Sequence, residues 1–408
     1  MPDPQDKANL PPRRRGAAFC AVAIGLPIVI VAALIATFAV MSSVRTAKTN
    51  KADSVPASDT RQLREAARNP NVDPGSRLPG TAAPSFTLTD QFGAKVSLSQ
   101  FRGKVVVLAF LDSRCTTICP LTTVSMTQAV RMLGPAAARH VQLLGINANP
   151  DATAVSDVRA YSAAHQMPPS WHFLTGSKSQ LAPVWRAYHV YVAASHGEID
   201  HQPALYVIDT RGRERTLYLT QMAYAGVGQQ ADLIASGVSK LLPGHPAPHD
   251  LVPLKLATAI KPTSPAHLPV VGGARQARTI ALGPGHPHLV VFIASWVSET
   301  SRLPAALREL ASYQSQARRH GWPSVVAVDE SQTESNVNAL PRVLANAGGA
   351  RLGYPVVADT SGRVSDGYGV LDIPWIALTS STGRILFSHD GWLSLAALTK
   401  AVAAHRAR

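Results

Sequence analysis

The sequence has few cysteines and few charged residues for its length. Only 3 of its 408 residues are cysteine, too few for the disulfide framework that stabilises small secreted domains. Charged residues make up 16% of the chain and hydrophobic residues 46%, which excludes an intrinsically disordered polymer. The length therefore predicts two compact domains with additional segments, each domain large enough to bury a core.

Acidic side chains are also scarce. The sequence has 25 aspartates and glutamates and 39 lysines and arginines, which gives a net charge of +14. A basic protein that binds nucleic acid usually concentrates its positive charge in a stripe with interleaved aromatic residues. Here the charge is spread along the whole chain, and aromatic residues make up only 6%. The sequence therefore argues against nucleic acid as a partner.

Charge is absent altogether from residues 17–41, which read AAFCAVAIGLPIVIVAALIATFAVM. As a helix this segment would be about 37 Å long, enough to cross a hydrocarbon core of roughly 30 Å. Three arginines, Arg13 to Arg15, precede it and would hold a basic N-terminus, residues 1–16, in the cytoplasm. No small-residue cleavage site follows directly. We therefore expect a single-pass plasma-membrane anchor rather than a signal peptide, with the rest of the chain extracytoplasmic, as in bacteria.

Two segments without sustained apolar periodicity divide the remainder. Residues 42–79 are polar and rich in Ser, Asp, Pro and Ala, which is typical of a linker. Residues 243–269 are rich in proline and histidine, and the prolines recur too often for a continuous helix or strand. The sequence thus predicts one domain at 80–242 and a second at 270–408.

Strand and helix patterns alternate in the first domain. Apolar runs at 104–111, 141–146 and 204–208 are typical of buried strands, and helical patterns span 120–133 and 155–165. A small hairpin, 86–98, precedes them and turns at Gly93. Strands that alternate with helices predict an α/β sheet with crossover connections.

The two cysteines outside the apolar segment, Cys115 and Cys119, stand where the first strand gives way to a helix. If the helix began at Cys115, the two would share one face, with Cα atoms about 6 Å apart. That spacing suits either a disulfide or a metal ion held between two sulfurs. A helix N-terminus also stabilises thiolate, the form that attacks disulfides and binds soft metals. A purely structural disulfide is the alternative in an oxidising compartment.

His201 precedes the strand at 204–208 and is the third candidate ligand. Thiolates favour Cu(I) and imidazole also accepts Cu(II), so Cys115, Cys119 and His201 together could hold copper in both states. Zinc is a chemical alternative, although a closed structural zinc site would need a fourth ligand. Taken alone, a histidine before a strand is more often a surface or packing residue.

With these residues in view, residues 80–243 resemble the Sco/SenC family of membrane-anchored, thioredoxin-fold copper chaperones. The matching features are FTLTDQFGAKVSLSQFRGKVVVLAF, CxxxCP at Cys115 to Pro120, the strand ending at Asn149-Pro-Asp151, TGSKSQ at Thr175 to Gln180, and Asp200-His201. The resemblance implies one copper ion per chain, bound by Cys115, Cys119 and His201. It implies delivery of that ion to the binuclear copper site of cytochrome c oxidase, or reduction of the cysteines there.

The match to that family has two departures. Thr116 stands where the family commonly has the first proline of CPxxCP, which would loosen the loop between the cysteines. Pro203 follows His201 where thioredoxin-fold oxidoreductases have a cis-proline, so a metal-free thiol–disulfide oxidoreductase acting through Cys115 and Cys119 is the rival hypothesis. A non-catalytic binding protein is the third. The sequence does not fix the isomer of Pro203 or Pro374.

Residues 270–408 resemble TlpA/ResA-type thioredoxin-like proteins, in the strand ending at Trp296 and in Asp372-Ile-Pro374. Val297 and Thr300 occupy the two cysteine positions, and no cysteine occurs in this part of the sequence. Disulfide exchange needs sulfur, so we expect a redox-inactive second thioredoxin-like domain. Trp296 and Trp375 would either line a groove for a partner or belong to the core of a spacer domain.

Overall fold

The computed structural model describes residues 68–195, 198–252, 256–274, 277–297, 302–334, 336 and 338–406. The apolar segment 17–41, with Cys20, and most of the linker at 42–79 lie outside these residues. In the described part no helix is long and apolar enough to cross a membrane. The expected anchor is therefore untested.

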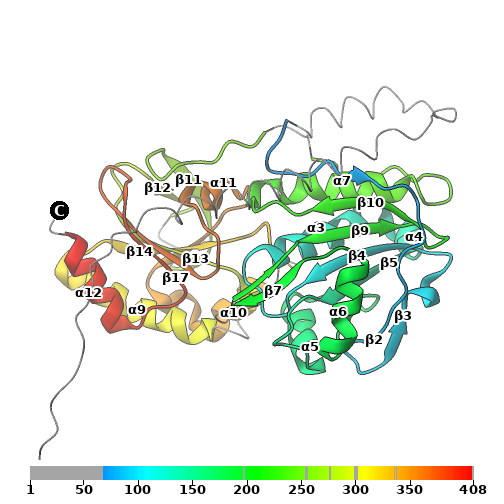
Figure 1. Ribbon diagram of the computed structural model, residues 1–408. Coiled ribbons are helices and arrows are strands. Elements are labelled where there is room, and N and C mark those ends of the chain that lie inside the picture. The colour runs from blue at the N-terminus through cyan, green and yellow to red at the C-terminus, as the bar shows by residue number, and fades with distance from the viewer. Residues whose placement is uncertain are drawn as a thin grey trace, which may run out of the picture. The chain divides into compact units, whose positions relative to one another are not determined.

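The first sheet has six strands in the order β1-β10-β9-β4-β5-β6 (Figure 1). The strands are β1 (Ser76–Arg77), β4 (Val105–Leu111), β5 (Val141–Asn147), β6 (His172–Leu174), β9 (Ala204–Ile208) and β10 (Glu214–Leu219). β4 pairs in parallel with β5 and antiparallel with β9. The apolar runs at 104–111, 141–146 and 204–208 thus form three adjacent strands, as the sequence predicted.

Helices cover both faces of this sheet, with α7 and α6 on opposite sides (Figure 1). The helices are α3 (Ile118–Met132), α4 (Gly134–Ala138), α5 (Val155–Ala164), α6 (Lys178–Ala187) and α7 (Val227–Ser239). Alternate β4 side chains point to the two faces, as the pleat requires. Val105 and Val107 pack with α3 and α7, whereas Val106 and Leu108 pack with α6. Every β4 residue is buried, which explains its unbroken apolar sequence.

Two hairpins flank the sheet. β2 (Thr87–Thr89) pairs with β3 (Lys95–Ser97), which confirms the hairpin expected at 86–98. β7 (Val192–Ser195) pairs with β8 (Glu198–His201), with Val192 opposite His201. The second hairpin matters for function because it ends at the predicted histidine ligand, immediately before β9.

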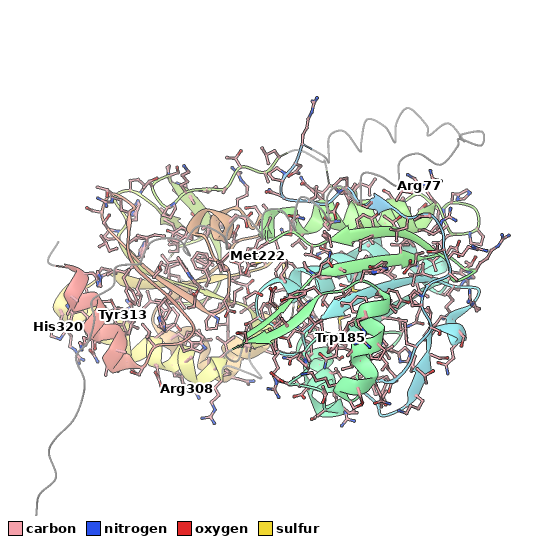
Figure 2. All side chains as sticks on the ribbon, in the orientation of Figure 1. Arg77, Trp185, Met222, Arg308, Tyr313 and His320 are labelled. Atoms are coloured by element: carbon pink, nitrogen blue, oxygen red, sulfur yellow. The ribbon has the colours of Figure 1, made fainter. Side chains whose placement is uncertain are left out.

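The second sheet has seven strands in the order β12-β11-β15-β14-β13-β16-β17. They are β11 (Ala266–Gly273), β12 (Thr279–Leu282), β13 (His288–Ile293), β14 (Ser324–Asp329), β15 (Pro355–Ala358), β16 (Trp375–Thr379) and β17 (Ile385–Asp390). The helices are α9 (Leu303–His320), α10 (Ala339–Ala347), α11 (Arg363–Tyr368) and α12 (Leu395–Arg406). Figure 2 labels Tyr313 on α9, fully buried, and Trp185 on α6, 6% exposed.

Five strands of the second sheet repeat the arrangement of the first. The order β17-β16-β13-β14-β15 matches β10-β9-β4-β5-β6. The directions match too: β13 is parallel to β14 and antiparallel to β16, as β4 is to β5 and β9. This order agrees with the expected architectural repeat, whereas the exact domain boundaries remain predictions. Of the described peptide bonds only Ile373–Pro374 is cis, so the bond before Pro203 is trans.

The two sheet regions share apolar packing. The cluster around the second sheet includes Leu121 and Val124 of α3 and Tyr224 and Val227 near the start of α7, each at most 2% exposed. The carboxylate of Asp366, on α11, accepts hydrogen bonds from the backbone N–H groups of Tyr224 (2.8 Å) and Ala225 (3.1 Å). The described residues from 68 onward accordingly belong to one compact unit.

Candidate metal and thiol site

A short loop at the C-terminal end of β4 carries Cys115. The Asp112 side chain accepts a hydrogen bond from the backbone N–H of Arg114 (2.8 Å), and its carbonyl accepts one from the N–H of Cys115 (3.2 Å). These bonds close a tight turn of the kind that Asp favours. The loop therefore holds Cys115 just ahead of α3.

The helix begins at Ile118, not at Cys115 as the spacing argument supposed. Cys115 lies in the loop and Cys119 in the first turn, so the two do not share a helix face. Pro120 fits this first turn because N–H groups there have no partner within the helix. The correction follows from the Asp112 turn, which occupies the residues that would have made an earlier helical turn.

The two cysteines are reduced and in contact. The backbone N–H of Cys119 donates to the Cys115 sulfur at 3.4 Å, so the start of α3 supplies a donor to that sulfur. Hydrogen bonding from the Cys119 thiol lowers the pKa of Cys115, and contact with the Thr117 hydroxyl (3.3 Å) acts the same way. Burial raises the pKa of Cys119, which is 1% exposed, well above its usual value. Of the two thiols, Cys115 is therefore the one that loses its proton more readily.

His201 reaches this pair from the far end of the β7–β8 hairpin. Its Nε2 lies 3.6 Å from the Cys119 sulfur. Its Nδ1 lies 3.2 Å from the backbone oxygen of Gln202, and because a carbonyl only accepts, Nδ1 carries the proton there. Burial lowers the pKa of His201 and favours the neutral ring. The unprotonated Nε2 therefore faces Cys119, which is the orientation a metal ligand needs.

Cys119 thus contacts both of the other predicted ligands, Cys115 and His201. Across the described ranges, no group of three or more His, Cys, Asp or Glu side chains is placed so that it could already hold a metal ion. In this reduced pair the Cys115 sulfur accepts the Cys119 N–H. Metal binding would have to remove the Cys119 proton, and with it the hydrogen bond that the Cys119 thiol makes to Cys115.

The sequence argument missed Asn149 as a positioning residue. Its side-chain N–H donates to Asp112 at 2.7 Å, and both residues are buried. The Asp112 N–H in turn donates to the Cys119 sulfur at 3.4 Å. The buried Asp112 side chain therefore helps to hold the loop in its conformation. The Asn-Pro-Asp motif was the available signal, although only the alignment of β4 beside β5 reveals its contact.

Trp296 borders the cysteine loop from the second sheet region. A small cavity of about 40 Å³ beside Cys115 is lined by Tyr161, His165 and Trp296 among others. The Trp296 indole N–H donates to Thr333 at 3.0 Å, and the residue is 4% exposed. Trp296 is therefore a core residue that also contributes to the wall of the site.

The corresponding end of the second sheet carries carboxyl groups where the first has thiols. The Ser295 N–H and hydroxyl both donate to Glu334, and the Ser365 hydroxyl donates to Glu330. Burial raises the pKa of Asp329, Glu330 and Glu334. The sequence has no cysteine in residues 270–408, and the redox-inactive role remains a prediction.

Comparison with known proteins identifies the first region. Residues 75–231 match the family model described as SCO1/SenC, which confirms the resemblance inferred for this region. The bovine protein named Protein SCO2 homolog, mitochondrial, is 32% identical over 134 residues, 31% of this chain and 50% of that protein. The SCO1 protein homolog of Bacillus subtilis is 28% identical over 133 residues, 31% of this chain and 68% of that protein. The chain thus spans half the length of the bovine relative.

Among solved structures, Arabidopsis thaliana ScoI with copper bound is 23% identical, covers 39% of this chain and 97% of that chain, and has a TM-score of 0.35. The family model ends at residue 231. The thioredoxin-like character of residues 270–408 therefore remains a prediction.

Proposed function

We propose that this chain, whose residues 75–231 match the SCO1/SenC model, carries one copper ion as cargo on Cys115, Cys119 and His201. The observation that supports this most directly is the 3.6 Å approach of His201 Nε2 to the Cys119 sulfur. The two residues are 82 positions apart, and nothing in local structure would bring them together. The ring nitrogen that faces the sulfur is the one left free to bind.

Copper suits this donor set better than zinc does. Two sulfurs and one imidazole are soft and intermediate ligands, the types that Cu(I) prefers. A structural zinc site takes four protein ligands. Cys115 is the more readily deprotonated of the two thiols, and Cys119 must also lose its proton as the ion enters. No electron moves in this step if the ion arrives as Cu(I).

The family resemblance supplies the proposed target, the binuclear copper site of cytochrome c oxidase, where the protein would deliver copper or reduce cysteines. The apolar segment 17–41 would anchor the chain in the plasma membrane, with residues 80–408 outside. The ion would then pass by ligand exchange to thiolates of the partner, because a site of only three ligands leaves copper open to a fourth.

A second candidate function, thiol–disulfide exchange, is favoured by the unequal pKa values of the two cysteines. The Cys115 thiolate would attack a partner disulfide, and one partner cysteine would leave as a thiolate. The Cys119 sulfur would then attack Cys115, and its proton would pass to the departing partner sulfur. The second partner cysteine would leave as a Cys115–Cys119 disulfide forms, so two electrons pass to the partner.

An anaerobic Cu(I) titration of the reduced full chain in detergent, against a competing chelator, tests the copper proposal. The chain should bind one ion. Cys115→Ser should abolish competitive binding, and His201→Ala should weaken it by more than about tenfold, the size of effect seen when even an outer partner of a metal ligand is lost. His140→Ala, at an exposed position in the same region, is the matched control and should bind like the native chain.

Failure of the native chain to compete for Cu(I) would overturn the copper proposal. The exchange hypothesis would then be tested by reduction of a model disulfide, which requires Cys115 and Cys119. Equal copper binding by the His201→Ala and His140→Ala variants would remove His201 from the ligand set.

A further inference from the structure

A large cavity in the described part of the chain lies beside the second half of α3, and no cysteine lines it. It has a volume of about 690 Å³, within the range of roughly 300–1,000 Å³ typical of small-molecule sites. Its walls come from α3, α4, the start of β5 and the segment after α5. The cavity is distinct from the proposed copper site, and the proposed function assigns nothing to it.

Apolar side chains form much of the lining. Val141 and Leu143 of β5 are almost fully buried, and Val130 of α3 and Ala138 of α4 face them across the cavity. Pro135 and Pro168 add further apolar surface. An apolar ligand would displace water from the accessible part of this lining, Val130, Ala138, Pro135 and Pro168, and would gain about 25 cal/mol per Å² there.

The lining includes polar groups that carry no charge. The Thr127 hydroxyl already donates to backbone oxygens of α3, those of Thr123 and Val124 at 3.0 Å. His165 also lines the cavity, and burial lowers its pKa to about 3, so it carries no charge at neutral pH. The charge of the site therefore comes from other residues.

All the charged side chains that line the cavity are cationic: Lys104, Arg131 and Arg139. No aspartate or glutamate is among the lining residues. Within the described ranges, none of these three cations forms an ion pair. Three like charges around an apolar hollow repel one another, and an anion placed among them would relieve that repulsion.

We propose that this cavity binds an amphiphile with one anionic head group and an apolar tail, of which a long-chain carboxylate is the simplest example. The head group would lie among Lys104, Arg131 and Arg139, where guanidinium groups pair well with carboxylate or phosphate. The tail would lie against Val130, Pro135 and Pro168. A free fatty acid and an anionic membrane lipid offer the same chemistry.

Photo-crosslinking tests this proposal on the full chain in nanodiscs of zwitterionic phospholipid. One sample receives a photoreactive palmitate analogue and another the matching alcohol, and labelled peptides are mapped by mass spectrometry. A third uses nanodiscs that contain a photoreactive anionic phospholipid. Saturable labelling of the peptides around residues 127–143 by the carboxylate, and weak labelling by the alcohol, is the expected result.

Two variants with matched controls sharpen the test. Arg131→Gln combined with Arg139→Gln should reduce carboxylate labelling about tenfold, the size expected for lost charge-assisted hydrogen bonds. Lys178→Gln combined with Arg186→Gln, on exposed positions of α6, removes the same charge and should leave labelling unchanged. Ala138→Phe fills the cavity without changing charge and should block labelling.

Each outcome of the crosslinking is decisive. Labelling only by the anionic phospholipid identifies a membrane lipid as the source, and labelling only by the palmitate analogue identifies a free acid. Equal labelling by alcohol and carboxylate would overturn the proposal. So would absence of saturable labelling in every sample, or equal labelling of the two double variants.

Discussion

His165 and Trp296 stack on each other, with ring centroids 5.1 Å apart and ring planes at 29°. His165 follows α5 in the first sheet region, whereas Trp296 follows β13 in the second. Both line the small cavity beside Cys115. The region without cysteines therefore contributes a wall to the site of the region that has them, and is more than a tethered spacer.

Removing the Trp296 side chain should expose Cys115. We expect Trp296→Ala to increase the rate at which iodoacetamide alkylates Cys115, and to lower the free energy of unfolding by about 3–5 kcal/mol, as for other buried aromatic residues. The rate is measured on the Cys115 peptide by mass spectrometry, which separates it from Cys20. Trp322→Ala is the control, because Trp322 stacks on His320 at 5.0 Å in the same sheet region. Equal alkylation rates in the two variants would contradict the assignment.

The Cys115 thiolate should depend on Cys119. Hydrogen bonding from the Cys119 thiol is the largest cause of the lowered pKa of Cys115, so Cys119→Ala should raise that pKa. The alkylation rate of Cys115, measured against pH, should rise at lower pH in the native chain than in the variant, since only thiolate reacts. Thr117→Val, which removes a smaller contribution, should shift the profile less. An unchanged profile in Cys119→Ala would show that the cysteine contact does not set the pKa.

Asp232 should make the protein less stable as the pH rises. Burial raises the pKa of Asp232 from 3.8 to about 7. The hydrogen bond that its carboxylate accepts from the Val252 N–H acts in the opposite direction but is the smaller effect. Between these values the folded state keeps a proton that the unfolded state has lost, so the free energy of unfolding falls as pH increases from about 4 to 7. Asp232→Asn removes this dependence and should gain on the order of 2 kcal/mol relative to the native chain between pH 4.5 and 8.

Urea unfolding at pH 4.5 and pH 8 measures the Asp232 effect. Glu309→Gln, at an exposed position of α9, serves as the control for removal of one carboxylate. If the native chain and Asp232→Asn differ by the same free energy at both pH values, the carboxyl group does not titrate in this window.

Asp366 should contribute to stability through the two hydrogen bonds that its carboxylate accepts from backbone N–H groups. Asp366→Ala leaves the N–H groups of Tyr224 and Ala225 without this partner, and we expect the free energy of unfolding to fall by about 1–3 kcal/mol. Asp366→Asn keeps one acceptor oxygen and should lie between. Asp390→Ala, at an exposed residue, should cost much less. Equal costs for Asp366→Ala and Asp390→Ala would show that these hydrogen bonds do not hold the regions together.

Local pattern was enough to predict the central elements of the first region. A continuous apolar run is buried on both faces of a sheet, so the segment at 104–111 became β4, and the helix expected from Pro120 to Leu133 became α3, Ile118–Met132. The start of that helix was predicted less well. The helix begins slightly earlier than expected, at Ile118. The Asp112 turn, which Asn149 contacts from another part of the chain, keeps Cys115 outside it.

The sequence alone determined the chemical types at the site: two cysteines after a buried strand, one histidine before another, and no thiol in residues 270–408. Only the tertiary structure decided which of them meet, because β4 and β9 pair side by side and bring His201 to Cys119. It also decided which cysteine loses its proton more readily, since the burial of Cys119 and the helix N–H at Cys115 arise from packing. The contact of Trp296 with His165 had the same origin: stacking between distant residues leaves no periodic signal in a sequence.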